Sequence, residues 1–137
     1  MSGPAEDIAL MMTTLVVPDY DAAIAFYVGT LGFAFVEDTD LGGGKRWVVV
    51  APGAGGTPGA RLLLARAHGE RQRAAIGNQA GGRVSFFLHT QAFDETHARF
   101  TAAGVTFEEE PRHEPYGTVA VFSDPFGNRW DLIQPKA

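Results

Sequence analysis

The chain has 137 residues, no cysteine and a formal net charge of −5. This length fits one domain, or two small halves that share a core, and the lack of cysteine excludes disulfides, thiolate nucleophiles and cysteine-ligated metal centres. The basic residues form no continuous stripe, no apolar run reaches the roughly 20 residues that span a bilayer, and the acidic start "MSGPAEDIAL" is unlike a secretory signal, so we expect a soluble cytoplasmic protein with neither nucleic acid nor membrane as a partner.

The first half of the chain predicts one strand, one helix and three more strands. After a flexible segment at residues 1–7, "LMMTTLVV" has the apolar, β-branched content of a strand. In "PDYDAAIAFYVGTLGF" apolar residues recur at helical spacing, with Asp19 as the N-cap and Gly32 just beyond the last turn. Three strands follow in "FAFVEDTD", "KRWVVVA" and "ARLLLAR", separated by turns rich in glycine and proline. Residues 8–66 therefore form a βαβββ module.

The second half repeats this order. Its strands and helix are predicted in "RVSFFLHT", "AFDETHARFTAAGVTF", "TVAVFSD" and "RWDLIQ". Aligning "TLGFAFVED" with "AAGVTFEEE" places Gly32 on Gly104, a repeat with a period of about 72 residues. Residues 83–137 form the second module, and the polar, arginine-rich residues 67–82 form a linker with room for a short helix.

The predicted fold class is therefore α+β, a single domain over residues 8–137 made of two tandem βαβββ modules. Because a four-stranded unit cannot cover both faces of its own sheet, the modules should bury these faces together or across a dimer. A ferredoxin-like βαββαβ sandwich also begins β-α-β. The strand pair "KRWVVVA" and "ARLLLAR" favours four strands per repeat instead.

Three segments together resemble the vicinal oxygen chelate superfamily, which includes glyoxalases, bleomycin-resistance proteins and extradiol dioxygenases. They are "LVVPDYDAAIAFYVGTLGF", "AAGVTFEEEP" and, most specifically, "YGTVAVFSDPFGNRWDLIQ". The resemblance covers nearly the whole chain from Leu10 onward. It implies modules whose curved sheets form a cup-shaped, half-open barrel around a small-molecule site, commonly completed in a homodimer.

The last strand carries one carboxylate, Asp131. In "DPFGN", Pro125 and Gly127 favour a tight turn that closes a hairpin. Strand alternation then puts Asp131 on the same face as Arg129 and on the opposite face from Trp130. If Trp130 packs under the helices, Asp131 and Arg129 point into the cup and form its polar floor or wall.

Metal-dependent members of the superfamily place a His, Glu or Gln on the first strand of each module and a carboxylate on the last. By resemblance, these positions fall on Met12, Ser85 (or Val84 if the register slips by one), Leu63 and Asp131. A divalent ion needs at least two or three nitrogen or oxygen ligands, and only Asp131 supplies one. We therefore expect no metal or other cofactor, and keep a divalent metal at Asp131 with non-standard ligands as the alternative.

Two histidines are further candidates. His89 lies on the strand of Ser85, roughly 13 Å farther along, which predicts a place at the rim of the cup. His113 lies in the loop "EEEPRHEPYG", whose segment 111–116 could act as a lid. The plainer alternatives are a rim histidine bonded to water or backbone and a solvated charged loop. The predicted ligand-binding residues are Met12, Thr14, Ser85, Phe87, Tyr116, Arg129 and Asp131.

Two functions remain open from the sequence. The first is a module that binds a small aromatic or anionic metabolite or drug without metal, as the bleomycin-resistance branch does. The second is an enzyme, either a glyoxalase-type lyase or isomerase, or a dioxygenase-like enzyme, with unusual metal ligands, or a metal-free acid–base catalyst. For that catalyst, the candidate residues are Asp131, His89 and His113, with Arg129 beside the carboxylate.

Overall fold

The computed structural model describes residues 7–53 and 59–137, so the predicted flexible segment 1–7 lies outside the described residues except for Asp7. The first half of the chain contains β1 (Met12–Val17), α1 (Tyr20–Ile24), η2 (Ala25–Thr30), β2 (Ala34–Gly42), β3 (Lys45–Ala51) and β4 (Arg61–Arg66). After α2 (Gly69–Ala75), the second half contains β5 (Val84–His89), α3 (Phe93–Ala102), β6 (Thr106–Phe107), β7 (Arg112–Glu114), β8 (Gly117–Ser123) and β9 (Arg129–Pro135).

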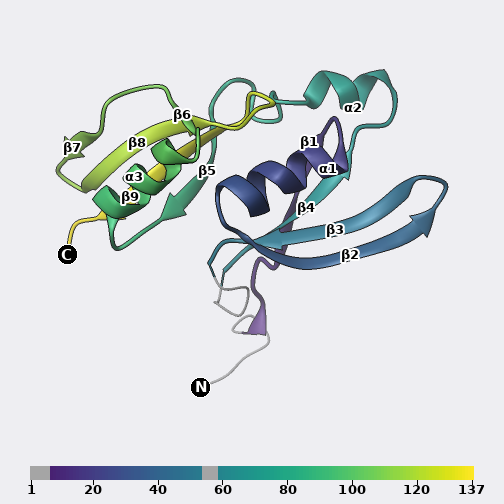
Figure 1. Ribbon diagram of the computed structural model, residues 1–137, viewed down its shortest axis with the longest axis horizontal. Coiled ribbons are helices and arrows are strands. Elements are labelled where there is room, and N and C mark those ends of the chain that lie inside the picture. Colours follow the sequence, from purple (N-terminus) through teal and green to yellow (C-terminus); the bar gives the residue numbers. More distant parts are fainter. Residues whose placement is uncertain (1–6, 54–58) are drawn as a thin grey trace.

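The strands form two separate sheets, which confirms the α+β fold class, and the described residues form no closed barrel. The first sheet has the order β1-β4-β3-β2, and the second has the order β5-β9-β8-β6 with β7 paired to β8. In Figure 1 the second sheet lies on the left and the first on the right, with α2 at the upper right of the view.

The first helix begins and ends where its sequence predicts. The Asp19 carboxylate accepts a hydrogen bond from the Ala22 backbone N–H at 2.8 Å, which caps the first turn. Gly32 takes a positive φ of 79° just after the helix, a conformation that favours glycine. The second half of the helix, η2, is a π-helix, which the apolar spacing did not predict.

The second module departs from the first at its second strand. Where the first module has the nine-residue β2, the second has only the two-residue β6, followed by β7. Beyond β6 the Glu109 side chain, rather than a backbone carbonyl, accepts from the Val121 N–H at 3.0 Å. A side chain thus replaces part of the ladder on β8, and the expected strand divides into β6 and β7.

One hydrophobic core joins both halves of the chain, and Tyr27 lies at their junction. Its ring centroid is 5.7 Å from that of Trp130 on β9. Its hydroxyl donates to Asp124 at 2.6 Å and accepts from the Trp130 indole N–H at 3.1 Å. Trp130 and Leu132 are buried in this core, which confirms the predicted alternation along β9.

The segment between the modules contains α2 and touches both of them. Gln79 donates to the Thr14 carbonyl at 3.0 Å and accepts from the Val16 N–H at 2.6 Å, so it occupies the free edge of β1. Among the described residues, no helix is long and apolar enough to cross a membrane.

Candidate functional site

The candidate residues lie mainly on the sheet faces that point away from the helices, which we call the open faces. On β9, Asp131 and Arg129 lie on the open face, while Trp130 points into the core. The strand register places Asp131 beside Phe87 on β5 and beside Val121 on β8. The carboxylate therefore sits in the interior of the second sheet and not at its edge.

Asp131 has no hydrogen-bond partner for one of its oxygens. Its Oδ1 is buried and unpaired. Burial is the main cause that raises the pKa of the Asp131 carboxyl. The Arg112 guanidinium lowers this pKa, Glu109 raises it further, and Arg129 lowers it by a smaller amount. A buried carboxylate oxygen without a donor is costly, so this position favours a proton, a water molecule or a donor group on a ligand.

Charged residues that the sequence interpretation did not select surround Asp131. Arg112 on β7 bonds Glu109 at 2.8 Å and Glu114 at 2.9 Å. These two carboxylates, and then the Tyr116 side chain, raise the pKa of the Arg112 guanidinium. The charged run "EEEPRHEP" contains these residues, but its sequence predicts a loop and not the strand β7.

Arg129 lies on the same face as Asp131, as predicted, but forms its ion pair with another carboxylate. Its guanidinium bonds Glu108 at 3.0 Å and donates to the Gly82 carbonyl at 3.0 Å. Glu108 raises the pKa of Arg129, and Arg129 followed by Ser123 lowers the pKa of Glu108. Arg129 thus ties β9 to the chain before β5 instead of neutralising Asp131.

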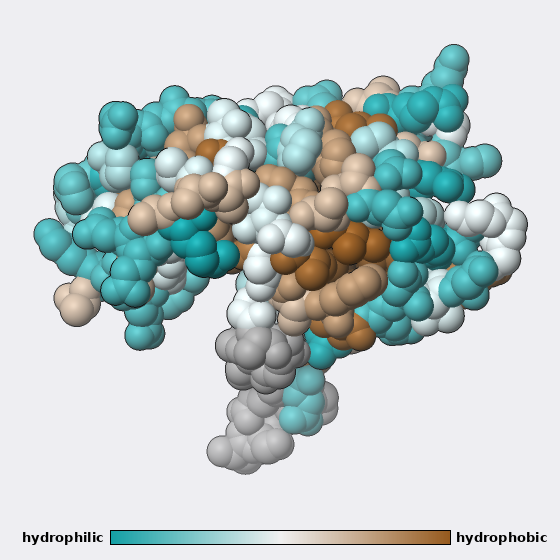
Figure 2. Space-filling model, viewed as in Figure 1, coloured by the Kyte–Doolittle hydropathy of each residue, from teal (hydrophilic) through white to brown (hydrophobic). Residues whose placement is uncertain are grey.

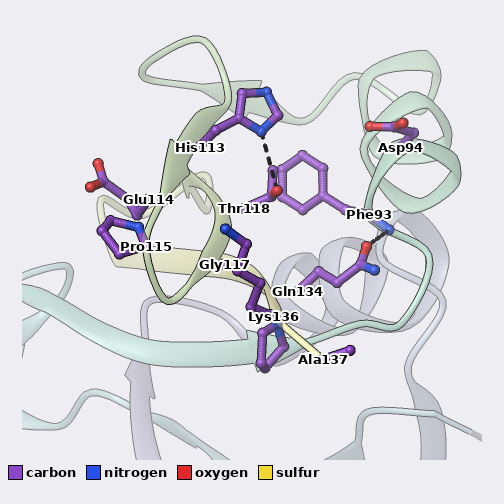
Figure 3. A pocket seen from close by; sticks show the side chains of 11 residues that line it. Phe93, Asp94, His113, Glu114, Pro115, Gly117, Thr118, Gln134, Lys136 and Ala137 are labelled. Atoms are coloured by element: carbon purple, nitrogen blue, oxygen red, sulfur yellow. Dashed lines mark hydrogen bonds between the residues drawn. The ribbon is translucent and has the colours of Figure 1, made fainter.

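His113 lies on the opposite side of the second sheet, so the prediction that it covers the cup is wrong. The register places His113 opposite Thr118, and its Nδ1 lies 3.3 Å from the Thr118 hydroxyl oxygen. Figure 3 shows both residues on the α3 side, in a cavity of about 560 Å³ that Phe93 and Gln134 also line.

The other predicted residues of the second sheet lie closer to Asp131. His89 is exposed and lies opposite Ile133, two residues beyond Asp131. Ser85 lies at an irregularity in the β5–β9 ladder, so that Val84 is the residue opposite Arg129.

The first sheet brings together a second group of predicted residues. Thr14 on β1 lies opposite Leu63 on β4, and Met12 lies opposite Arg61. Thr14, Leu63 and Trp47 of β3 line a cavity of about 680 Å³. Asp131 does not line this cavity, so the structure does not combine all the predicted ligand-binding residues in one pocket.

The side chains at the family's metal positions do not form a fitting set of ligands. They are a thioether at Met12, an aliphatic group at Leu63 and a hydroxyl or aliphatic group at Ser85 or Val84, so Asp131 alone offers a carboxylate. In the described part of the chain, no group of three or more His, Cys, Asp or Glu residues is arranged to hold a metal ion.

Comparisons with known proteins give consistent results. The model of the Glyoxalase/Bleomycin resistance protein/Dioxygenase superfamily matches residues 9–132. An uncharacterized protein of Shewanella frigidimarina (strain NCIMB 400) is 50% identical over 127 residues, which cover 92% of this chain and 93% of that protein. The uncharacterized protein YurT of Bacillus subtilis (strain 168) is 31% identical over 130 residues, with coverage of 91% and 98%.

Solved structures show the same likeness. UcmS2 has 34% sequence identity and a TM-score of 0.79, with 92% of this chain and 97% of that chain covered. TnmS3, described as an antibiotic binding protein from Streptomyces sp. CB03234, has 30% identity and a TM-score of 0.74, with coverage of 94% and 97%.

Proposed function

Because the chain belongs to the Glyoxalase/Bleomycin resistance protein/Dioxygenase superfamily, we propose that it binds a small organic molecule, such as an antibiotic, on its open faces without a divalent metal. The observation that carries this proposal is the unpaired, buried Oδ1 of Asp131 at the position where relatives place a metal ligand. Two further positions where relatives place metal ligands are occupied by Met12 and Leu63. Their apolar side chains suit the wall of a small-molecule site. That TnmS3 is described as an antibiotic binding protein supports the same function.

In this proposal, Asp131 accepts a hydrogen bond from the ligand and aromatic side chains supply stacking surface. Phe87 is beside Asp131 and 68% exposed, and Trp47 on the first sheet is 37% exposed. Aromatic rings with exposed faces provide large contact area at low entropic cost. Ser85 and Tyr116 are the further contacts proposed on the second sheet, and Met12 and Thr14 are those proposed on the first.

We further propose a cytoplasmic homodimer that needs no cofactor. Large apolar side chains exposed on a single chain favour burial against a second copy. Figure 2 shows such residues gathered near the middle of the view, between outer ends that are mostly hydrophilic. The exposed large apolar residues of the described chain are Ile8, Leu10, Met11, Phe35, Leu41, Trp47, Phe87 and Tyr116.

A second candidate function is metal-free acid–base catalysis by Asp131. It is favoured by the raised pKa of this carboxyl, which burial causes and which brings a carboxyl closer to the range of a general base. A catalyst would turn over its ligand, whereas a binding protein releases it unchanged. Mass spectrometry of a ligand recovered after incubation with the protein separates the two functions.

The binding proposal is tested by screening an antibiotic library for compounds that raise the melting temperature, followed by calorimetric titration. Asp131→Asn should fold normally and weaken binding of a compound found this way by about 1 to 3 kcal/mol, because a charged hydrogen bond is lost. Asp94→Asn, an exposed carboxylate on α3, is the matched control and should bind like the original protein. Unchanged binding by Asp131→Asn would place the ligand away from Asp131.

Metal content is a separate test. The protein purified without chelators should contain well under one equivalent of nickel, zinc, iron or manganese per chain by elemental analysis. A stoichiometric metal that disappears in Asp131→Ala would contradict the proposal.

A further inference from the structure

Strands β3 and β4 separate at one end of the first sheet. Their ladder ends at the pair Val48 and Leu64. Beyond this pair, Trp47 of β3 stays paired with β2 and Ala65 of β4 stays paired with β1, but β3 and β4 are no longer paired with each other. A slot therefore opens between the two strands at this end.

The Tyr20 side chain lies in this slot. Its hydroxyl accepts from the Arg46 backbone N–H at 3.1 Å, so a side chain satisfies a backbone group where β3 has lost its β4 partner. The slot belongs to the cavity of about 680 Å³, whose walls include Tyr20, Lys45, Arg46, Trp47, Ala65 and Arg66.

Three lysine and arginine side chains line the slot, and only one of them is in an ion pair within the described residues. Arg46 is paired with Asp21 at 2.9 Å and with Asp38 at 2.6 Å. In contrast, Lys45 and Arg66 form no ion pair within the described chain. No aspartate or glutamate is among the described residues that line the cavity.

The Arg66 guanidinium is kept at the slot by its contact with the Tyr20 ring. Its guanidinium carbon lies 5.2 Å from the centroid of the Tyr20 ring, within the range of a cation–π contact. Its Nη2 would lie 3.2 Å from a Cβ atom at Gly44, so Arg66 extends from β4 to the β2–β3 hairpin. An anion in the slot would thus meet a guanidinium that stacking already orients.

We propose that this slot binds the anionic group of a flat aromatic ligand. Lys45 and Arg66 pair with the carboxylate or phenolate of the ligand, and the ring of the ligand stacks on Trp47, which is 37% exposed. The inference rests on the proposed function and names its ligand class at the first sheet, whereas the test with Asp131→Asn concerns the second sheet.

The experiment titrates the ¹⁵N-labelled protein with three probes of similar shape and different charge: naphthoate, naphthamide and naphthylmethylammonium. The chain has two tryptophans, Trp47 in the slot and Trp130, which is 3% exposed and serves as the internal reference. Naphthoate should shift the Trp47 indole resonance and the Ala65 and Arg66 amides, and leave Trp130 in place. It should bind at least about tenfold more tightly than naphthylmethylammonium, with added salt weakening only naphthoate binding.

Two variants identify the charges responsible. Lys45→Gln and Arg66→Gln should each weaken naphthoate binding about three- to tenfold and leave naphthamide unchanged. Lys45 is exposed, so its variant is expected to fold even if Arg66→Gln disturbs Tyr20. Arg61→Gln is the control, because Arg61 lies on the same strand roughly 17 Å from Arg66 and does not line the cavity.

Two results would overturn the inference. Equal binding of the three probes at Trp47 would refute the anionic class while leaving small-molecule binding at the first sheet intact. No shift of Trp47 with any probe would refute the slot as a site, and the library screen with Asp131→Asn would then decide the proposed function independently.

Discussion

At the scale of single residues, Tyr27 and Asp131 show two different fates of a buried polar group. The Tyr27 hydroxyl is fully buried but has two partners, Asp124 and the Trp130 indole. Burial, followed by the nearby Asp124, raises the pKa of Tyr27, so the hydroxyl keeps its proton and donates it. Asp131 instead leaves one buried oxygen unpaired. Paired groups of this kind support the fold, whereas unpaired ones are candidates for ligand contacts.

Replacing Tyr27 with phenylalanine should be strongly destabilising. Tyr27→Phe leaves the Trp130 N–H without an acceptor and removes a donor from Asp124, so we expect a loss of about 2 to 3 kcal/mol in the free energy of unfolding by urea titration. The control is Tyr20→Phe, whose hydroxyl serves one partly exposed backbone group and should cost at most about 1 kcal/mol. Equal losses would mean that the buried hydrogen bonds of Tyr27 contribute little.

The raised pKa of Asp131 predicts a stability effect that depends on pH. In the unfolded chain this carboxyl loses its proton near its usual pKa of 3.8, and in the folded chain it does so at higher pH. The folded state therefore loses stability as pH rises from 3.8 through the folded pKa.

Asp131→Asn removes this penalty. Calorimetry should show a higher melting temperature than the original protein at about pH 7 and no difference at about pH 3, where both forms are uncharged. Asp94→Asn should not show this gain. A melting temperature that falls at neutral pH would instead identify Asp131 as a residue that stabilises the fold.

At the scale of elements, the segment between the modules packs more tightly than its composition suggests. Gly77 has a φ of 68°, and a Cβ atom there would lie 2.0 Å from the Phe126 carbonyl oxygen. This glycine therefore lets the segment lie directly against the "DPFGN" turn of the second module. Gly81 has a similar φ of 65° but nothing within 4 Å of its Cβ position.

These two glycines form a matched pair for mutation. Both alanine variants carry the strain of a positive φ, about 1 kcal/mol or more, but only Gly77→Ala also meets a backbone atom. We expect Gly77→Ala to lose at least about 2 kcal/mol more than Gly81→Ala in the free energy of unfolding. Similar losses in the two variants would show that the turn can move away from Gly77.

Most elements could be predicted from the sequence because their signals are local. β3 has the bounds of the apolar run that predicted it, and the alternation along β9 placed Asp131 on the open face correctly. β7 could not be predicted, because it depends on pairing with β8. Without β7 in the prediction, His113 was expected on the wrong face of the sheet. The partner of Arg129 was also missed, since Glu108 is 21 residues away in the sequence.

At the scale of the whole molecule, the arrangement of two open sheets favours self-association. Large apolar side chains remain exposed on both sheets, for example Trp47 on the first and Phe87 on the second. A second copy would cover these side chains.

We therefore expect light scattering at micromolar concentration to give about twice the chain mass of 14.7 kDa. Phe87→Glu should shift the population toward the single-chain mass if the open face is covered in the dimer. A mass near that of one chain for the original protein would refute the dimer.

The Gln79 side chain bears on aggregation of the protein during expression and storage. It covers part of β1, which is an outer strand of the first sheet. Outer strands with bare backbone groups recruit strands from other molecules and start insoluble aggregates. By occupying the Thr14 carbonyl and the Val16 N–H, Gln79 removes one acceptor and one donor from that template. An amide from the segment between the modules thus lowers the tendency of this edge to pair with another chain.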